Sequence, residues 1–580
     1  MPESLFLELP SELIVVILSF LPLSDLVACR RTNKLLDSTI ESSVVLQYLI
    51  ELQVAGAVDN PSSSLPVSDR LRVLKARESA WEQIECTNVT SIRVDFNPSS
   101  IYDLTGGVFL LGESLYEPFA RTFRETDALR WLRLSRASGD KPTLSPWFKI
   151  DLEASILDVG LAVEEHDLIA VVTQAIQLQT RTVVFDVHLL QIATGECHPR
   201  AAHPAIRVSE VPIFAGQCSV SVEIVGDMLA ILMNFPYLQG VQPQRPGEFH
   251  MFDWLTGRQT LSRSGGHVQY LAFVFLSRDV VALTNCTENS LELCYIGDTL
   301  SNDSPDPQRL ETVCRLALPR LAPVAFIRQV LCRSEPNPSG CDSTFGNNDG
   351  SPFRPDPKDS VVIFNFFIRV GEIVGRVYTL SLIMHRSALL AWLPPRPPKV
   401  SHSDAVSEDL LPGDTDDASR RGLHAELSTV PWAVWGPPAT RWLNGMSPNN
   451  RWITTTCGQR HVAVGHDMPF QISILNFNQL SLRRFIAQHP HSEALLSVTR
   501  ERTEPTNGET VLIHAVHEPS TLFLEVFEEV VVSCLPYLST TTIGEYDYAN
   551  VLLDEDRIIG INLDEDENIS EIVVHSINYE

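Results

Sequence analysis

Lysine is scarce in this chain of 580 residues, and negative charge outnumbers positive charge. Six lysines occur, and 44 lysine and arginine residues stand against 72 aspartate and glutamate residues, which gives a formal net charge of −28. The basic residues form no stripe along any segment. A nucleic-acid partner requires clustered Lys and Arg that neutralise phosphates. The sequence therefore predicts no nucleic-acid binding.

Long apolar runs and an export signal are also missing. The apolar stretch from Ile14 to Leu23 has ten residues and is flanked by Glu12 and Asp25, whereas a helix that spans a bilayer needs about 20 apolar residues. A secretory signal starts with a basic region, but the first charged residues here are Glu3 and Glu8. We expect a protein of the cytoplasm or nucleus, without a membrane partner.

Motifs of catalysis and of metal binding are missing too. The sequence has no GxSxG, no glycine-rich phosphate loop and no HExxH. Its 11 cysteines are odd in number and include no CxxC pair, which favours free buried thiols over disulfides or a zinc site. We therefore expect no metal, no cofactor and no catalytic residues, which means that the protein is not an enzyme.

The start of the chain does contain short apolar helices, in the stretch LFLELPSELIVVILSFLPLSDLVACRRTNKLL from Leu5. Pro10 suits the first position of a helix, where no amide donor is needed. One broad apolar face is predicted by the spacing of Leu9, Leu13, Val16, Ile17, Phe20 and Leu21. Pro22 ends this helix, and Ser24 suits the N-cap of the next.

Further along the chain the hydrophobic period changes from helix to strand. Seven short apolar runs recur, and five of them start with Asp: GVFLLG, DLIAVV, DMLAIL, DVVALT, DSVVIF, RWITTT and DRIIGI. Most are followed by a second, alternating strand. A buried run beside a half-alternating partner is typical of the inner and middle strands of a propeller blade. We expect the runs to be the inner strands of six or seven blades.

These patterns predict an α+β, multidomain fold with three parts. Residues 1–58 form a small helical domain, 59–88 a linker loop and a connector helix, and 89–580 a mainly-β, propeller-like repeat domain. Polar segments near 301–308, 334–359 and 393–422 are rich in Pro, Gly, Ser and Asp, and are expected to be disordered insertions. If the ring closes, the final EIVVHSI strand pairs with a strand near Ile92 to Phe96, because an open ring exposes edges.

The opening stretch resembles an F-box, a family motif that starts with Leu-Pro, breaks at a second Pro and resumes at Asp-Leu-hydrophobic with a Cys. The matching residues here are Leu9, Pro10, Leu13, Ile17, Leu18, Leu21, Pro22, Asp25, Leu26, Val27 and Cys29. Arg30 to Lys34 stands where many F-boxes have a Trp, a form similar to F-box proteins of higher fungi, which often end in a β-rich region.

The resemblance implies a substrate-recognition subunit of an SCF-type ubiquitin ligase. Such a subunit docks on a Skp-type adaptor, and through it on a cullin, while the β domain captures a protein substrate. The expected adaptor-binding residues are Leu9, Pro10, Leu13, Ile17, Leu18, Leu21, Leu26 and Val27.

Other interpretations remain open at this point. The protein could be an F-box scaffold without ligase function, or a propeller-fold enzyme with a helical cap; the helical domain could also pack on its own propeller. Because interfaces favour Trp and Arg, the substrate surface is expected to use aromatic side chains, with core packing as the alternative for each. The candidates are Trp254, Trp432, Trp435 and Trp442.

Overall fold

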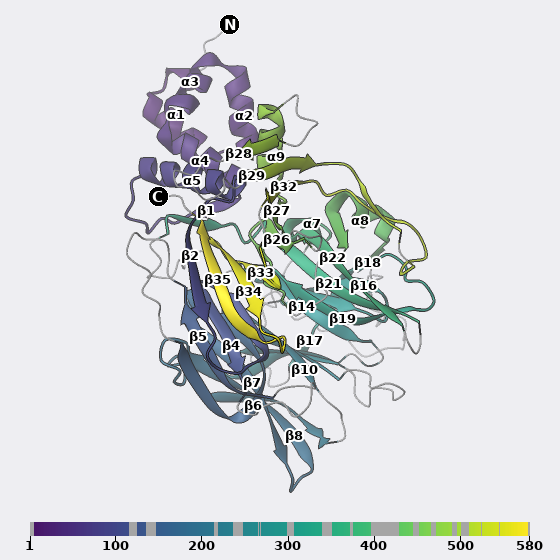
Figure 1. Ribbon diagram of the computed structural model, residues 1–580. Coiled ribbons are helices and arrows are strands. Elements are labelled where there is room, and N and C mark those ends of the chain that lie inside the picture. Colours follow the sequence, from purple (N-terminus) through teal and green to yellow (C-terminus); the bar gives the residue numbers. More distant parts are fainter. Residues whose placement is uncertain are drawn as a thin grey trace, which may run out of the picture.

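A computed structural model gives the architecture of the chain (Figure 1). The structure describes residues 5–114, 125–134, 147–213, 218–235, 247–264, 266, 268–297, 307–338, 351–371, 375–395, 428–444, 452–465, 471–489, 496–499, 510–523, 525–543 and 546–577.

A helical module opens the chain and stands on one end of a β-rich domain (Figure 1). Its elements are η1 (Leu5–Glu8), α1 (Ser11–Leu18), α2 (Leu23–Thr32), α3 (Lys34–Ser42), α4 (Val44–Ala55) and α5 (Val67–Glu82). Proline residues precede α1 and α2, the side chains of Asn33 and Ser43 cap α3 and α4, and Gly56 ends α4 with φ +62°. These caps satisfy amides and carbonyls that the short helices leave unpaired.

The β domain consists of seven four-stranded antiparallel units, two of which share the long strand β6 (Phe148–Ala162). The first unit holds β3 (Pro98–Thr105), β4 (Val108–Glu113), β5 (Thr126–Arg133) and the start of β6. The second holds the end of β6 with β7 (Leu168–Gln177), β8 (Thr182–Gln191) and β9 (Ala205–Pro212). The third holds β10 (Ser219–Val225), β11 (Met228–Asn234), β12 (Glu248–Asp253) and β13 (Arg258–Ser264), extended by β17 (Gln308–Arg309).

The remaining four units complete the domain. The fourth has β14 (Tyr270–Ser277), β15 (Val280–Asn285), β16 (Ser290–Tyr295) and β18 (Thr312–Ala317), with β23 (Ser428–Val430) at its edge. The fifth has β19 (Ala325–Arg333), β21 (Val361–Val370), β22 (Arg376–His385) and β24 (Thr440–Asn444). The sixth has β25 (Thr456–Cys457), β26 (Arg460–Val464), β27 (Ile472–Asn476) and β32 (Tyr537–Ile543), extended by β29 (Thr510–Val516) and β28 (Leu496–Thr499). The seventh has β33 (Asn550–Leu553), β34 (Arg557–Leu563), β35 (Ile569–Ile577) and β2 (Cys86–Arg93).

Two small sheets and four further helices lie outside the seven units in the described part of the chain. They are the two-stranded sheets β1 (Ala57–Asp59) with β20 (Phe353–Pro355) and β30 (Ser520–Leu522) with β31 (Val531–Ser533), and the helices α6 (Val163–His166), α7 (Arg386–Leu390), α8 (Trp432–Ala439) and α9 (Gln479–Gln488). Within the described residues, none of the helices has the length and apolar character needed to cross a membrane.

Each unit packs on the next through its own cluster of buried apolar side chains. One such cluster joins the seventh unit back to the first, through residues such as Ile559 and Ile572 on one side and Phe109 and Leu111 on the other. The units therefore form a closed ring, which is the arrangement of a β-propeller. The expected mainly-β, propeller-like domain behind a helical module is confirmed, with seven units.

The predicted closure of the ring is confirmed as well. The last strand, β35, pairs with the early strand β2, with Ile572 opposite Ile92 and Glu571 opposite Arg93. The N-terminal strand thus becomes the outermost strand of the seventh unit. This pairing joins segments from the two ends of the chain and leaves no open end in the ring.

The assignment of the apolar runs to inner strands is wrong. Six of the seven runs lie in the second strand of their unit, namely β4, β7, β11, β15, β21 and β34, whereas RWITTT leads into the first strand of the sixth unit. Neighbouring units approach one another through their first strands, as β10 does with β14 and β14 with β19. The second strands read as continuous apolar runs because both of their faces lie between neighbouring units.

The segment 334–359 was expected to be a disordered insertion, and its described part is ordered. Residues 351–359 carry β20, which pairs with β1 of the helical module, and Phe353 is fully buried among Tyr48, Leu52 and Leu74. A buried aromatic side chain and a strand partner explain why this polar stretch holds a single position. Residues 339–350, 301–306 and 396–422 of the expected insertions lie outside the described residues.

The helical module is attached to the ring rather than separated from it by the loop that starts at Asp59. Arg484 in α9 pairs with Glu51 in α4 (2.7 Å), and the Asn478 side chain donates to the carbonyl of Val54 (2.8 Å). Arg77 in α5 pairs with Glu555 at 3.3 Å and lies over the ring of Phe353. Helices α4 and α5 therefore contact the ring, which leaves α1 and α2 on the far side (Figure 1).

Candidate functional site: an apolar face on the N-terminal helices

The first two helices form a small core of their own. Ile14 and Leu18 of α1 and Leu26 of α2 are buried, together with Leu36, Ile40 and Leu46 from α3 and α4. Pro10 and Pro22 lie at the N-caps of α1 and α2, where their fixed φ starts each helix. The prolines thereby set where each helix begins.

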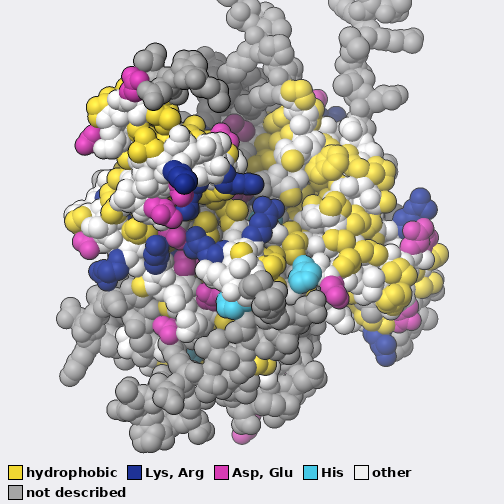
Figure 2. All heavy atoms as spheres, turned by 90° about the horizontal axis from the view of Figure 1, so that it is seen from above, with side chains coloured by type: hydrophobic (Ala, Val, Ile, Leu, Met, Phe, Trp, Pro, Cys, Tyr) yellow, Lys and Arg dark blue, Asp and Glu magenta, His cyan; other side chains and the backbone are white. Residues whose placement is uncertain are grey.

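The opposite face of α1, continued by Phe20 in the turn after the helix, is apolar and exposed. Leu13, Val16, Ile17 and Phe20 are between 42% and 83% exposed, and Phe20 is the most exposed of them. Val27 of α2 is 46% exposed. Seen from above, hydrophobic side chains lie at the surface on this side of the molecule (Figure 2). Several large apolar side chains gathered on one helix, and left uncovered by the described part of the chain, are typical of a docking surface.

A comparison with known protein families identifies this module. The family model described as "F-box domain" matches residues 6–47. The N-terminal helices are an F-box domain. The F-box therefore covers η1, α1, α2, α3 and the start of α4, and a β-rich domain follows it.

Comparisons of the whole chain with curated proteins and solved structures do not identify a function for the β domain. No curated protein matches the sequence. Among solved structures, the WD40 domain of Toxoplasma gondii coronin is similar with a TM-score of 0.32 and 9% identity, over 86% of this chain and 88% of that one. A luciferin-regenerating enzyme is similar with a TM-score of 0.25 and 6% identity, over 79% of this chain and 96% of that one. Scores this low indicate no function for the ring.

The structure divides the expected adaptor-binding residues of the F-box into three groups. Leu13, Ile17 and Val27 are exposed, as is Pro10. Leu9 and Leu21 are half-buried against the F-box core. Leu18 and Leu26 are each 1% exposed, so the expectation that they lie on the docking surface is wrong. They belong to the core of the module.

Two exposed residues were absent from the expected set. Val16 lies on this face of α1 and Phe20 extends it in the turn after the helix, and both are more exposed than Leu13 or Ile17. The sequence carried the signal, since a period of 3.6 residues places positions 13, 16, 17 and 20 on one stripe. A motif that names only its recurring residues overlooks the variable apolar positions between them.

The aromatic side chains that were expected on a substrate surface lie mostly in the core. Trp254 lies between the second and third units and donates its indole N–H to the Gly226 carbonyl (2.8 Å). Trp435 donates to the Ala317 carbonyl (2.8 Å), and Trp442 is buried beside Phe366. Trp432 is half-buried with its ring against Trp435. The expectation is thus wrong for Trp254, Trp435 and Trp442, which cannot reach a partner.

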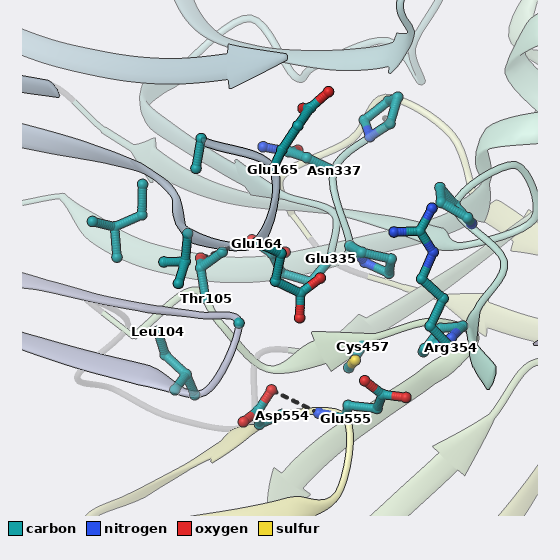
Figure 3. Close-up of a pocket in the computed structure, with 18 of the residues that line it drawn as sticks. Leu104, Thr105, Glu164, Glu165, Glu335, Asn337, Arg354, Cys457, Asp554 and Glu555 are labelled. Atoms are coloured by element: carbon teal, nitrogen blue, oxygen red, sulfur yellow. Dashed lines mark hydrogen bonds between the residues drawn. The ribbon is translucent and has the colours of Figure 1, made fainter. Parts of the chain in front are cut away.

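A second candidate site is an acidic cavity at the end of the ring that faces the F-box. It has a volume of about 110 Å³ and is lined by carboxylates from separate units: Glu164, Glu165, Glu335, Asp554 and Glu555 (Figure 3). The turn between β3 and β4 comes so close that a Cβ on Gly106, which has φ +56°, would lie 3.0 Å from the Glu164 side chain. Arg354 and Cys457 also line the cavity.

Below this cavity a charge network runs through the interior of the ring. Arg333 lies 2.7 Å from both Asp103 and Glu335 and 3.8 Å from Glu223. Burial raises the pKa of Glu335 to about 7 and that of the partly buried Asp158 to about 8, and the neighbouring carboxylates add to both shifts. The buried Arg386 donates to the carbonyls of Ser334, Pro336 and Pro357 at 2.7–2.8 Å, which orders the segments beside Glu335.

This network predicts a pH-dependent effect of Asp158→Asn on stability. The folded-state pKa of Asp158 is raised to about 8, so stability is highest below the unfolded pKa of about 4 and is lost as the pH rises through 8. Removal of the charge is therefore expected to raise the melting temperature, by at least about 2 °C at about pH 9 and by much less at about pH 5. Thermal melts at both pH values check this.

Asp95→Asn serves as the matched control, since Asp95 is an exposed carboxylate of the same type. It is expected to leave both melting temperatures unchanged. An Asp158→Asn protein that is equally or less stable than the wild type at high pH would show that Asp158 is not held in an unfavourable charged state.

The described residues contain no group of three His, Cys, Asp or Glu side chains placed to hold a metal ion. The ten cysteines in the described part of the chain are free thiols. Burial raises the pKa of Cys286 and Cys294 to about 12, which suits thiols that act as small apolar side chains.

Proposed function

We propose that this protein is the substrate-recognition subunit of an SCF-type ubiquitin ligase of the cytoplasm or nucleus. The F-box would dock on a Skp-type adaptor, the adaptor would bind a cullin, and the seven-unit ring would hold a protein substrate. The observation that carries the proposal is the apolar face formed by Leu13, Val16, Ile17 and Phe20, which stays exposed while Ile14 and Leu18 on the other side of α1 are buried.

The geometry supports a docking role over a purely structural one. An apolar helix face that served only to join the F-box to the ring would be buried against the ring, yet that junction is made by α4, α5 and β1. Exposing such side chains to water costs roughly 1.5–3 kcal/mol for each one relative to burial. A partner that covers the face of α1 recovers this free energy.

Reconstitution tests the ligase function directly. The full chain is expected to co-purify with a Skp-type adaptor and a cullin when the three are co-expressed, and the complex is expected to transfer ubiquitin to proteins that bind the ring. A complex that contains the adaptor but never the cullin would support the alternative of an F-box scaffold. Failure to retain the adaptor would contradict the proposal.

We propose that the chain divides into the F-box domain (residues 1–58), a linker with its connector helix (59–88) and the ring (89–580). Since α4 and α5 are bound to the ring through Glu51, Arg77 and Glu78, the F-box is held in a fixed orientation rather than on a free tether. A substrate on the ring would therefore keep a constant position relative to the ubiquitin-carrying machinery, which favours efficient transfer.

A further inference from the structure

A cleft of about 530 Å³ separates the F-box side of the molecule from the ring. Helices α4 and α5 form one wall, and α9, β26, β27 and β32 of the sixth unit form the other. Sites for small molecules commonly have volumes of about 300–1,000 Å³ and often lie between two modules. The cleft therefore has the size and the location of a ligand site.

The cations that line this cleft already have carboxylate partners. Glu51 lies 2.7 Å from Arg484 and 3.8 Å from Lys75, whose side chain is half-exposed. Glu78 pairs with Arg460 at 2.5 Å. An anionic ligand would have to displace one of these carboxylates, so the arrangement disfavours anions.

One carboxylate in the cleft stands apart from these pairs. Glu82 is the last residue of α5, and its backbone carbonyl is fixed by the Thr540 hydroxyl at 3.3 Å. Within the described residues, its side chain makes neither a hydrogen bond nor an ion pair. Burial raises its pKa; the charge of Glu78 raises it further, and His489 and Arg484 offset part of the shift. Glu82 is half-buried, and a partly buried carboxylate without a direct partner is stabilised by a cation.

An apolar surface lies in the same cleft. Phe485 of α9 and Leu538 of β32 pack together and are largely buried, and Ile474 of β27 and Trp81 of α5 line the cleft with them. A ligand can thus place an apolar body on this surface while a charged group faces Glu82.

We propose that this cleft binds a small organic cation, namely a primary amine with an aromatic or aliphatic body. The ammonium group pairs with Glu82, and the body packs on Phe485 and Leu538. Because α5 forms one wall and the sixth unit the other, the bound amine also ties the helical module more firmly to the ring. No covalent step is involved.

Calorimetric titration of the full chain tests the proposal with two probes of similar shape and opposite charge. Phenethylamine is expected to bind, whereas 3-phenylpropanoate is expected to bind at least about tenfold more weakly. Binding of the amine is also expected to raise the melting temperature. Equal binding of the two probes, or no binding of the amine at about 10 mM, would overturn the proposal.

Three variants separate the role of Glu82 from general effects. Glu82→Gln removes the charge of a half-buried side chain and is expected to fold; its affinity for phenethylamine is expected to fall at least about tenfold. Glu529→Gln, which changes an exposed carboxylate outside the cleft, is the matched control and is expected to bind normally. Ser79→Trp keeps Glu82 but fills part of the cleft, and is expected to weaken binding. Unchanged affinity in Glu82→Gln would refute the assignment.

Discussion

Ile17→Ala combined with Phe20→Ala is expected to lower the affinity for a Skp-type adaptor by at least about hundredfold. The two side chains are 42% and 83% exposed in the free protein, and docking would bury both. Each large apolar side chain buried at an interface contributes roughly 1.5–3 kcal/mol, so the pair accounts for about 3 kcal/mol or more. Calorimetry or surface plasmon resonance with the purified adaptor measures the loss.

Leu178→Ala provides the matched control for this pair. Leu178 follows β7 in the second unit and is 80% exposed, so the change removes a comparable exposed side chain far from α1. It is expected to leave adaptor binding unchanged. All of these proteins should melt as the wild type does, because none of the three side chains belongs to a core. Unchanged affinity in the well-folded double variant would mean that the face of α1 is not the docking surface.

Ile572→Asp is expected to destabilise the whole ring. Ile572 is fully buried in the cluster that joins the seventh unit to the first, and it lies opposite Ile92 in the strand pair that closes the ring. An unpaired charge at this place has no hydrogen-bonding partner, and such substitutions cost roughly 4 kcal/mol or more. A decrease in the melting temperature of about 4 °C or more is expected, because a ring of this length unfolds with an entropy of about 1 kcal/mol/K. Thermal unfolding followed by circular dichroism measures it.

Ile572→Val keeps the site apolar and removes one methyl group. It is expected to cost only about 1 kcal/mol, so its melting temperature should fall by only about 1 °C. If Ile572→Asp melted like Ile572→Val, the contact between the first and seventh units would contribute little, and the ring would not depend on its closure.

The F-box could be predicted from sequence because its signal is local. Two prolines, a four-residue apolar repeat and the residues after Pro22 determine where the helices start and how they turn. Which side chains face inward depends on α3 and α4, whose contacts with α1 cannot be read from its own period. For this reason Leu18 and Leu26 were expected on the surface, although they form the core with Leu36 and Ile40.

The sequence was sufficient to predict a propeller-like β domain and the pair of strands that closes its ring. The apolar runs identify strands that are covered on both faces, and the need to pair a terminal strand points from β35 to the segment at Ile92. The position of these runs within each unit was not predictable. The innermost strands β3 and β10 carry polar residues such as Asp103 and Glu223, which face the charge network around Arg333, so these strands do not read as apolar runs.

Long-range contacts account for the other differences between the predictions from sequence and the structure. The segment 351–359 has the composition of a loop, and it is ordered by β1, which lies about 300 residues away in the chain. Trp254, Trp435 and Trp442 have the residue type that interfaces favour, yet the same large apolar rings suit the contacts between units. Composition cannot separate these two uses of an indole, and only the neighbours Gly226, Ala317 and Phe366 do so.

Hydrogen–deuterium exchange of the full chain, with and without a Skp-type adaptor, tests the central claim most directly. We expect the adaptor to slow exchange in peptides that cover α1 and the start of α2, residues 11–27, while peptides from the ring exchange as before. Protection confined to the ring, or no protection of α1 at adaptor concentrations that saturate a known F-box, would contradict the assignment of the exposed apolar face as the docking surface.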